Sequence, residues 1–300
     1  MGEAEAGVYF LGRQRGQLRE PYQATDLAFG SSRLDESTLN NADFQHCTFA
    51  NISFKKTVVQ SGRFLDCVFI GCYFRRAELV DSSFVGCRFV DCQFTHIAIK
   101  SSKFPHSSFR GCQLAIEELE HNLPSEPNIR EALARNLSIE SSKLGLSAQA
   151  RLYRMAEIRA REEHLRAAIA GRSQWYREHF DGLARLRACA QLVLSLFNRW
   201  LWGYGERVAT LLRNLILVSF LLFPASFYFF RDGLKKNDGA PIDLSDLVYF
   251  SLENVFPSGI RSEVQAVEFV PRVLAGAESV FGVVVLALFA AYIFRWSLHR

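Results

Sequence analysis

The first half of the chain repeats its pattern of apolar and polar positions every five residues. A large apolar residue stands at each fifth position from 29 to 114 without a break, and a mostly small residue stands two positions before each. This period matches neither the helical repeat of about 3.6 residues nor the alternation of a flat strand. A chain that turns a corner every five residues and buries one large and one small side chain per side forms a solenoid, whose coils stack about 4.8 Å apart. The large series is Phe29, Leu34, Leu39, Phe44, Phe49, Phe54, Val59, Phe64, Phe69, Phe74, Leu79, Phe84, Phe89, Phe94, Ile99, Phe104, Phe109 and Leu114.

The pentads between residues 27 and 116 resemble the pentapeptide-repeat family, whose pattern is A(D/N)Lxx. The resemblance implies a square, right-handed β-helix with four pentads, and hence twenty residues, in each coil. In this chain phenylalanine replaces leucine at most central positions. The first half is therefore predicted to be a pentapeptide-repeat β-helix, a β-solenoid.

Six of the seven cysteines fall in the small series. On a twenty-residue coil they would stack in two columns inside the solenoid. We interpret them as small apolar filler in a reducing compartment, with metal ligation or redox sensing as the alternative. A packed interior leaves little room for tetrahedral coordination, so no metal ion and no cofactor are expected. The six are Cys47, Cys67, Cys72, Cys87, Cys92 and Cys112.

The residues at outward positions of the repeats indicate whether each side of the solenoid has an apolar or a charged surface. Two pairs one coil apart are apolar and predict an exposed ladder, of the kind that marks an interface with a cytosolic protein partner. Two further pairs are basic and predict a solvated face, with lipid headgroups, DNA or a protein as alternatives. Some pentapeptide-repeat proteins are acidic DNA mimics; a basic face does not suit that role, so no nucleic-acid partner is expected. The apolar pairs are Leu65 with Val85 and Ile70 with Val90, and the basic pairs are Lys55 with Arg75 and Lys56 with Arg76.

The segment HNLPSEPN at 121–128 contains two prolines and predicts the end of the repeats. Residues 148–169 then predict a charged connecting helix, packed on the solenoid or on its copy in another subunit. Its apolar side would carry Leu152, Met155, Ile158, Leu165 and Ile169.

Residues 175–202 show an amphipathic pattern that is interrupted by charge. Arg185, Arg187 and Arg199 would be costly inside a bilayer. The pattern favours a helix that lies on the cytoplasmic membrane surface, with Trp200 and Trp202 among the headgroups. A third membrane span is the alternative.

Two apolar runs, at 208–230 and 270–295, are each long enough to cross about 30 Å of hydrocarbon. The first carries one charged residue, Arg213, and the core of the second, 273–294, carries only Glu278. Basic residues flank both sides, so the positive-inside rule gives no orientation. Residues 1–20 lack an apolar signal core, which predicts a cytosolic first half. We therefore expect a multi-pass protein of the cell (inner) membrane with both termini in the cytoplasm and residues 231–272 outside.

The stretch between the spans contains YFSLENVFPSGI at 249–260. Asp243 and Asp246 are helix-capping residues, 247–256 would form two to three helical turns, and Pro257 with Gly259 would end them. A half-length helix at membrane depth needs protein or water around its backbone. The pattern at 243–262 predicts a re-entrant pore loop.

GYGERVATLLRNL, VYFSL and AESVFGVVVLALFAAYIFRW resemble the two-transmembrane pore module of potassium-channel-like proteins. The resemblance implies a homotetramer around one pore, lined by the second span. In place of the family's T-x-G-Y-G filter, however, the chain has Phe256-Pro257-Ser258-Gly259-Ile260-Arg261: Phe256 and Pro257 stand where threonines are expected, Arg261 stands at the second glycine, and only Gly259 agrees. We therefore predict a non-selective or anion-permeable pore, with an exposed Arg261 paired to Glu263 as the alternative.

Glu253 and Glu278 are further pore candidates, because ionisable residues at membrane depth usually face water or a partner. Asn254, next to Glu253, is included with the filter residues. A hydrogen bond that ties the pore helix to the inner helix is the alternative for both glutamates. Gly276 and Gly282 would allow the inner helix either to bend or to pack closely.

Three classes of function remain for a chain of 300 residues with a net charge of +4. The favoured class is an ion channel that binds the lipid bilayer and permeant ions. The alternative is a membrane-anchored binding scaffold with a non-conducting pore-like domain. An enzyme is not expected, since no phosphate-binding loop, nucleophile motif or other catalytic residue is recognisable. The predicted parts are an N-terminal segment 1–26, the β-helix 27–116, a helical linker 117–172, an interfacial helix 173–206 and a two-span domain 207–300.

Overall fold

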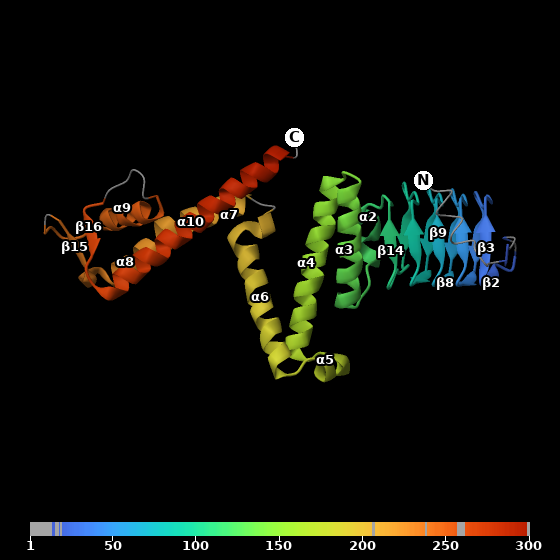
Figure 1. Ribbon diagram of the computed structural model, residues 1–300, viewed down its shortest axis with the longest axis horizontal. Coiled ribbons are helices and arrows are strands. Elements are labelled where there is room, and N and C mark those ends of the chain that lie inside the picture. The colour runs from blue at the N-terminus through green and yellow to red at the C-terminus, as the bar shows by residue number, and fades with distance from the viewer. Residues whose placement is uncertain are drawn as a thin grey trace. The chain divides into compact units, whose positions relative to one another are not determined.

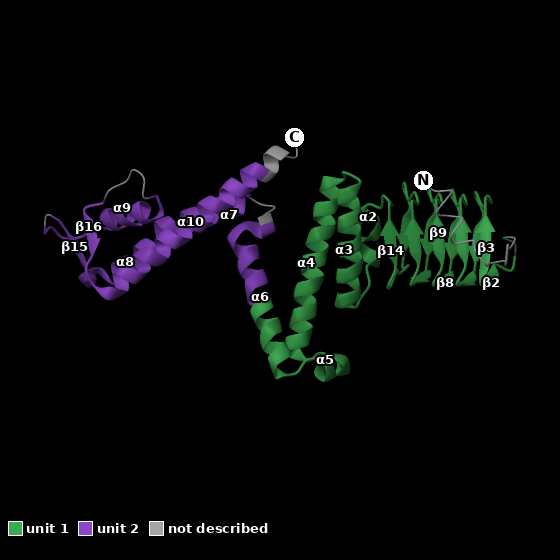
Figure 2. Cartoon of the chain, in the orientation of Figure 1, with its two compact units in different colours: residues 1–192 green, residues 193–300 purple. Residues whose placement is uncertain are grey.

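The computed structural model describes residues 14–15, 18, 20–205, 208–237, 239–256 and 262–298, with the backbone alone for 14, 15, 205 and 295–298. The chain forms two compact units, residues 1–192 and 193–300 (Figure 2).

The first unit begins with a parallel β-solenoid (Figure 1). Three of its sides are sheets of very short strands. One sheet contains β1 (Gln14–Arg15), β3 (Leu27–Gly30), β6 (Thr48–Ala50), β9 (Val68–Ile70), β12 (Arg88–Val90) and β14 (Ser108–Arg110). The second contains β4 (Thr38–Asn40), β7 (Val58–Gln60), β10 (Glu78–Val80) and β13 (Ala98–Lys100), and the third β2 (Gln23–Thr25), β5 (Asp43–Gln45), β8 (Arg63–Leu65) and β11 (Ser83–Val85).

From β2 onward the strands pair in a register of twenty residues, as the pentad pattern predicts, whereas β1 pairs with β3 as Gln14 with Leu27. Phe49 lies opposite Phe69, and Phe69 opposite Phe89. Isolated bridges such as Ser53 to Tyr73 form the fourth side with the same offset. The structure adds β1 and β2 before residue 27, the predicted start of the repeats.

The large series forms stacked columns of aromatic rings inside the solenoid. Phe69 stacks between Phe49 and Phe89, with ring centroids 4.7 and 4.8 Å apart and planes within 8° of parallel. All three side chains are buried. Each coil thus presents the next with the same flat apolar surface, which explains why the period has no break.

The small series has a second role that the pattern did not reveal. Its side chains donate hydrogen bonds to backbone carbonyls of the adjacent coil: Thr57 Oγ1 to Leu34 O at 2.6 Å, and Cys92 Sγ to Phe69 O at 3.4 Å. Burial raises the pKa of the Cys92 thiol well above its ordinary value. The described cysteines are free, and the six of the small series are buried.

The predicted exposed apolar ladder is wrong for one of its two pairs. Ile70 and Val90 are buried and form a cluster with Ala50 and Val68, whereas Leu65 and Val85 are half-buried. A repeat register shows which positions point outward, but whether they meet solvent depends on what else covers that face.

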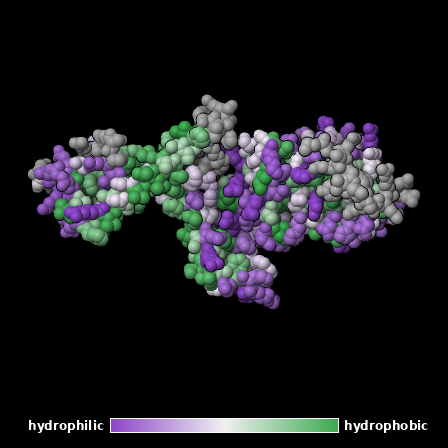
Figure 3. Space-filling model, viewed as in Figure 1, coloured by the Kyte–Doolittle hydropathy of each residue, from purple (hydrophilic) through white to green (hydrophobic). Residues whose placement is uncertain are grey.

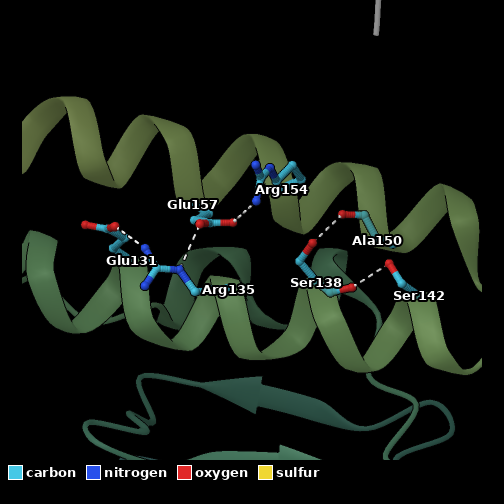
Figure 4. A network of polar contacts seen from close by, with 7 residues as sticks. All are labelled: Glu131, Arg135, Ser138, Ser142, Ala150, Arg154 and Glu157. Carbon is cyan, nitrogen blue, oxygen red and sulfur yellow. Dashed lines mark hydrogen bonds and ion pairs between the residues drawn. The ribbon is translucent and has the colours of Figure 1, made fainter. Parts of the chain in front are cut away.

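Helices close the C-terminal end of the solenoid. They are α2 (Ile116–Leu119), the 3-10 turn η1 (Glu120–Asn122), α3 (Pro127–Lys143) and α4 (Ser147–Ala170). The α3 and α4 pair packs side by side: Arg135 of α3 bonds Glu157 of α4 across the pair at 2.9 Å and Glu131 within α3 at 2.5 Å (Figure 4). Ser138 Oγ also donates to the Ala150 carbonyl of α4 at 3.1 Å.

The α3–α4 pair provides hydrogen-bond partners for the last coil, whose sheet edge would otherwise be open. Phe109 N–H donates to Asn136 Oδ1 at 2.7 Å, and Gly111 N–H donates to Glu140 Oε2 at 3.0 Å. The hydroxyl of Tyr153 donates to the Leu114 carbonyl at 3.1 Å. These bonds protect the solenoid from edge-to-edge pairing.

The predicted apolar side of the linker helix is only partly correct. Leu165 is buried, but Leu152 is exposed, and Tyr153, Glu157 and Ala160 take the inner side. The partners of α4 are a solenoid end and a charged helix, so a tyrosine and a glutamate with bonding partners fit there better than leucine.

Two more helices follow in the chain: α5 (Gln174–His179) and α6 (Gly182–Trp202). Asp181 starts α6 by accepting a hydrogen bond from Ala184 N–H at 2.7 Å. Leu186, Leu194 and Phe197 of α6 are exposed. The amphipathic character predicted for residues 173–206 therefore lies in α6, and α5 is a separate helix.

The second unit contains the apolar helices. In order these are η2 (Gly203–Gly205), α7 (Val208–Leu217), the π-helical turn η3 (Val218–Leu222), α8 (Phe223–Phe229), η4 (Arg231–Gly233), β15 (Leu234–Lys236), α9 (Leu244–Val255), β16 (Val264–Ala266) and α10 (Phe269–Leu298). Two helical stretches are suited by length and hydropathy to cross a membrane, Val208–Phe229 and Phe269–Phe294. Only 28% and 17% of their most apolar windows are buried. Helix α6, at 21 residues, is not among them.

We expect Phe69→Ala to destabilise the solenoid by about 3–5 kcal/mol, because it removes one ring from a stacked column and leaves a cavity. Denaturant titration followed by the β-sheet circular dichroism signal of the full chain measures this. Val85→Ala, at a half-buried outward position, is the control and should cost under about 1 kcal/mol. Equal effects of the two variants would contradict the stacked core.

Because Glu140 is ionised where it bonds the last coil, the stability of the closed solenoid end should depend on pH. Burial opposes its ionisation, but Lys143 and the Gly111 N–H outweigh burial and lower the pKa of Glu140. The carboxylate therefore stabilises the fold above the ordinary glutamate pKa of about 4.3, and this contribution disappears as the pH falls.

Glu140→Gln should accordingly cost about 1–2 kcal/mol at neutral pH and progressively less in acid. The free energy of unfolding, measured against pH for both proteins, tests this, with the exposed Glu120→Gln as the control. A cost that persists unchanged in acid would argue against the ionised carboxylate.

Candidate functional site

The candidate site is built around α9, the short helix between the two apolar helices of the second unit (Figure 1). Asp243 and Asp246 form a capping box at its first turn, in which Asp243 N–H donates to Asp246 Oδ2 at 3.0 Å. Lys236 Nζ lies 3.1 Å from the same oxygen. The Asp243 N–H and the Lys236 ammonium lower the pKa of Asp246. The helix thus begins at the capping residues predicted from the sequence.

Strands β15 and β16 pair in antiparallel fashion and bring together the two ends of the segment that contains α9. Leu234 and Val264 from these strands join Phe227, Leu247 and Phe250 in one apolar core. The sequence analysis missed both strands. Each is three residues long, and nothing in LKK or VQA distinguishes a strand from a loop.

Gly282 allows α9 to approach α10 closely. A Cβ atom at this position would lie 2.8 Å from Val255 O and 2.9 Å from Val255 Cα. A Cβ at Gly276 would meet nothing within 4 Å. Of the two packing glycines considered from the sequence, Gly282 is the one at a helix contact.

Glu278 of α10 is fully buried and bonds two side chains of α9. Its Oε1 is in short hydrogen-bond contact with Ser251 Oγ, and its Oε2 accepts from Asn254 Nδ2 at 3.1 Å. Ser251 Oγ also lies 2.7 Å from the backbone oxygen of Ser219 in η3. One polar cluster therefore links α9 to both apolar helices, and Glu278 makes the helix-tying hydrogen bond considered from the sequence.

Glu253 has a different role from Glu278. Its Oε2 accepts a hydrogen bond from Ser262 N–H at 2.8 Å. It therefore ties α9 to the chain that enters β16. An open groove of about 490 Å³ adjoins this contact, lined in part by Glu253, Asn254, Gln265, Arg272 and Ser279.

The structure describes only the first residue of the predicted filter. Phe256 is half-buried directly after α9, and its N–H donates to Leu252 O at 2.8 Å. Pro257, Ser258, Gly259 and Arg261 lie outside the described residues.

The π-helical turn η3 is a feature of the site that the sequence analysis missed. Phe223 N–H donates to Val218 O, five residues earlier. Pro224 follows directly and has no N–H to continue the ladder. The sequence signal that could have predicted this turn is the proline inside an apolar span, because membrane helices adjust their hydrogen bonding locally around a proline.

A buried amide side chain forms hydrogen bonds at the start of the first apolar helix. Asn214 of α7 is buried, and its Nδ2 donates to the carbonyls of Trp200 and Leu201 at the end of α6. It thereby supplies hydrogen bonds to carbonyls that a helix end leaves unpaired. Among the described residues, no three His, Cys, Asp or Glu side chains are grouped so that they could hold a metal ion.

Comparison with known proteins identifies the repeats. Residues 38–119 match the family model described as a pentapeptide repeat region. The chain therefore carries a pentapeptide-repeat domain, and this domain is a β-solenoid. No curated protein matches the chain.

Several solved structures are similar to the solenoid. A pentapeptide repeat protein, Rfr23 from the cyanobacterium Cyanothece, is 10% identical with a TM-score of 0.29, over 31% of this chain and 65% of that one. QnrB1, a plasmid-mediated fluoroquinolone resistance protein, is 16% identical with a TM-score of 0.23, over 31% and 55%. HetL from Nostoc, involved in heterocyst differentiation regulation, is 13% identical with a TM-score of 0.19, over 38% and 50%. The chain thus spans between half and two thirds of these proteins.

We expect Gly282→Val to push α9 away from α10, because the new side chain would overlap the backbone of Val255. Overpacking of this kind costs about 1–3 kcal/mol. A lower thermal midpoint and a shifted or broadened size-exclusion peak would show the effect. Gly276→Val is the matched control on the same helix, and equal damage by both substitutions would contradict the close contact.

Proposed function

We propose that the second unit is a pore-forming membrane module and that the chain acts as an oligomeric ion channel with a cytosolic pentapeptide-repeat domain. The observation that carries this proposal is α9, a capped helix of 12 residues bonded through Ser251 to η3 and through Ser251 and Asn254 to α10. A short helix held between two apolar helices by polar side chains is typical of a pore loop.

The polar cluster argues against a simple anchor. Burying Glu278 and Asn214 in helices that cross a bilayer costs free energy unless the groups serve a defined structure. A membrane anchor needs one apolar helix and no capped helix beside it. A pore module needs both, because its non-helical segment at membrane depth must be supported by protein.

The apolar surface of the second unit supports assembly within a bilayer. Val280, Val283 and Leu286 of α10 are exposed in the single chain. Hydrophobic residues gather over α7 and α10, and hydrophilic ones over β15 and β16 (Figure 3). Lipid and further copies of the chain would cover this surface, and the similarity to potassium-channel-like pore modules favours four copies.

The proposed topology places both ends of the second unit on one side of the membrane, because two spans return the chain to its starting side. Free thiols in the solenoid are typical of a reducing compartment and favour the cytosol for that side. Helix α6 would then lie on the cytoplasmic surface, with Leu186 and Leu194 in the lipid and its arginines among the headgroups.

A membrane-anchored binding scaffold is the second candidate function. The observation that favours it is the filter sequence, which has Phe256 and Pro257 where a potassium filter is expected to supply threonines and Arg261 in place of the second glycine. In that case the pentapeptide-repeat domain would bind a protein partner, and the second unit would only hold it at the membrane.

Recording from the purified full chain in planar bilayers under asymmetric KCl tests the channel. We expect currents whose reversal potential lies near zero or on the chloride side, because Arg261 stands where the potassium filter has a glycine. Arg261→Gln should move the reversal potential toward the potassium limit, whereas Glu263→Gln should not.

The particle mass in detergent accompanies the recording and should be that of four chains. A reversal potential at the potassium limit would contradict the predicted loss of selectivity. Silence from a folded, inserted oligomer would favour the scaffold.

A further inference from the structure

The hydroxyl of Ser251 lies between two oxygen atoms that both need a hydrogen. Its Oγ is 2.7 Å from Ser219 O and in short contact with Glu278 Oε1. A serine hydroxyl carries one proton and can donate only one hydrogen bond, although it can accept others. Ser251 can therefore serve only one of these two partners as a donor.

Of the two oxygen atoms, the Ser219 carbonyl is the one that needs the hydrogen bond from the Ser251 hydroxyl. Phe223 N–H, four residues on, is already bonded to Val218 O, and Pro224, five residues on, has no N–H. The helix thus offers this carbonyl no amide donor. Ser219 is buried, and a buried carbonyl without a donor costs about 1–3 kcal/mol.

If Ser251 donates to Ser219, the proton between Ser251 and Glu278 must belong to the carboxyl group. We infer that Glu278 is a proton-binding site: its carboxylic acid donates to Ser251 Oγ, Ser251 donates to Ser219 O, and Asn254 Nδ2 donates to Glu278 Oε2. Every polar group of the chain Glu278–Ser251–Ser219 carbonyl then has a partner. The ionised alternative leaves the carbonyl unpaired and buries an uncompensated charge.

Among the side chains that the structure describes on the elements packed around Glu278, the charged ones do not supply a counter-ion. Arg213 bonds Asn214, Asp246 bonds Lys236, Glu253 bonds Ser262 N–H, and Arg272 bonds the Ala266 carbonyl. The other titratable groups whose side chains the structure describes on α7, α8, α9 and α10 are Tyr228, Tyr249 and Tyr292. Among the described residues, the hydrogen-bond partners of the Glu278 carboxyl are the neutral Ser251 and Asn254.

The bound proton holds α9 against both apolar helices. Loss of the proton would place a charge in a buried site and remove the donor to Ser251, so the contact weakens as the pH rises. This regulatory consequence rests on the proposed function, because α9 controls conduction only if the second unit is a pore. The proton site itself does not depend on that function.

Infrared spectroscopy of the full chain in lipid tests the site directly. We expect the carbonyl stretch of a protonated, hydrogen-bonded carboxylic acid at neutral pH, lost in Glu278→Gln and shifted in Ser251→Ala. Ser219→Ala is the matched control: Ser219 Oγ has no hydrogen-bond partner in the described part of the chain, so the band should remain. A folded wild-type protein without the band, or a band that survives in Glu278→Gln, would overturn the inference.

The pH dependence supplies the second readout. In the wild type the equilibrium between seated and released α9, followed by amide hydrogen exchange, should change up to about tenfold per pH unit in favour of release as the pH rises, the limit for one proton. Glu278→Gln should abolish this dependence yet keep the fold, because its amide can donate to Ser251 and accept from Asn254.

Neither readout requires conduction, so failures of the two proposals can be told apart. The infrared band in a protein that passes no current would support the proton site and reject the channel. Currents from a protein that lacks the infrared band would support the channel and reject the proton site.

Discussion

Buried backbone amides and carbonyls must find hydrogen-bond partners, and this requirement shapes both units of the chain. In the solenoid each coil supplies partners to the next, until the last coil reaches Asn136 and Glu140 of α3. In the apolar unit, Pro224 leaves the Ser219 carbonyl without an amide donor, and Ser251 of α9 supplies one. Asn214 does the same for the end of α6. Polar residues stand in these apolar surroundings because the backbone there needs them.

The two units meet the requirement differently, and the difference matters for function. The solenoid is a ladder of equivalent contacts, so its stability is spread over many stacked rings and bonds. In the second unit the polar contacts between α9 and the two apolar helices are gathered in one cluster, in which Glu278, Ser251 and Asn254 join three segments. A change at one residue can alter the whole arrangement there. Polar contacts gathered in one cluster suit a unit that changes its conformation, whereas the repeated contacts of the solenoid suit a rigid surface.

The phase of the repeats was predictable, because a period of five fixes which positions point inward, but their start was predicted too late, since β2 already pairs with β5. The capped helix α9 and the apolar helices were predictable from local signals at Asp243 and from hydropathy. Strands β15 and β16 were not, since three-residue strands are held by partners distant in sequence. The exposure of Ile70 and Val90 was predicted wrongly for a related reason. Glu278 and Asn254 were both singled out from the sequence, but neither the bond between them nor the part that Ser251 plays was predicted.

The amino-acid sequence by itself determined the solenoid, its phase, the order of the helices and the presence of a carboxyl group in an apolar span. Each follows from interactions between residues close in sequence or at a constant spacing. Only the tertiary structure decided that Gly282 rather than Gly276 is a contact and that Ser251 bridges Glu278 to Ser219. Only the tertiary structure showed that α3 closes the solenoid. These contacts join segments with no common period, and their geometry arises only when the helices pack.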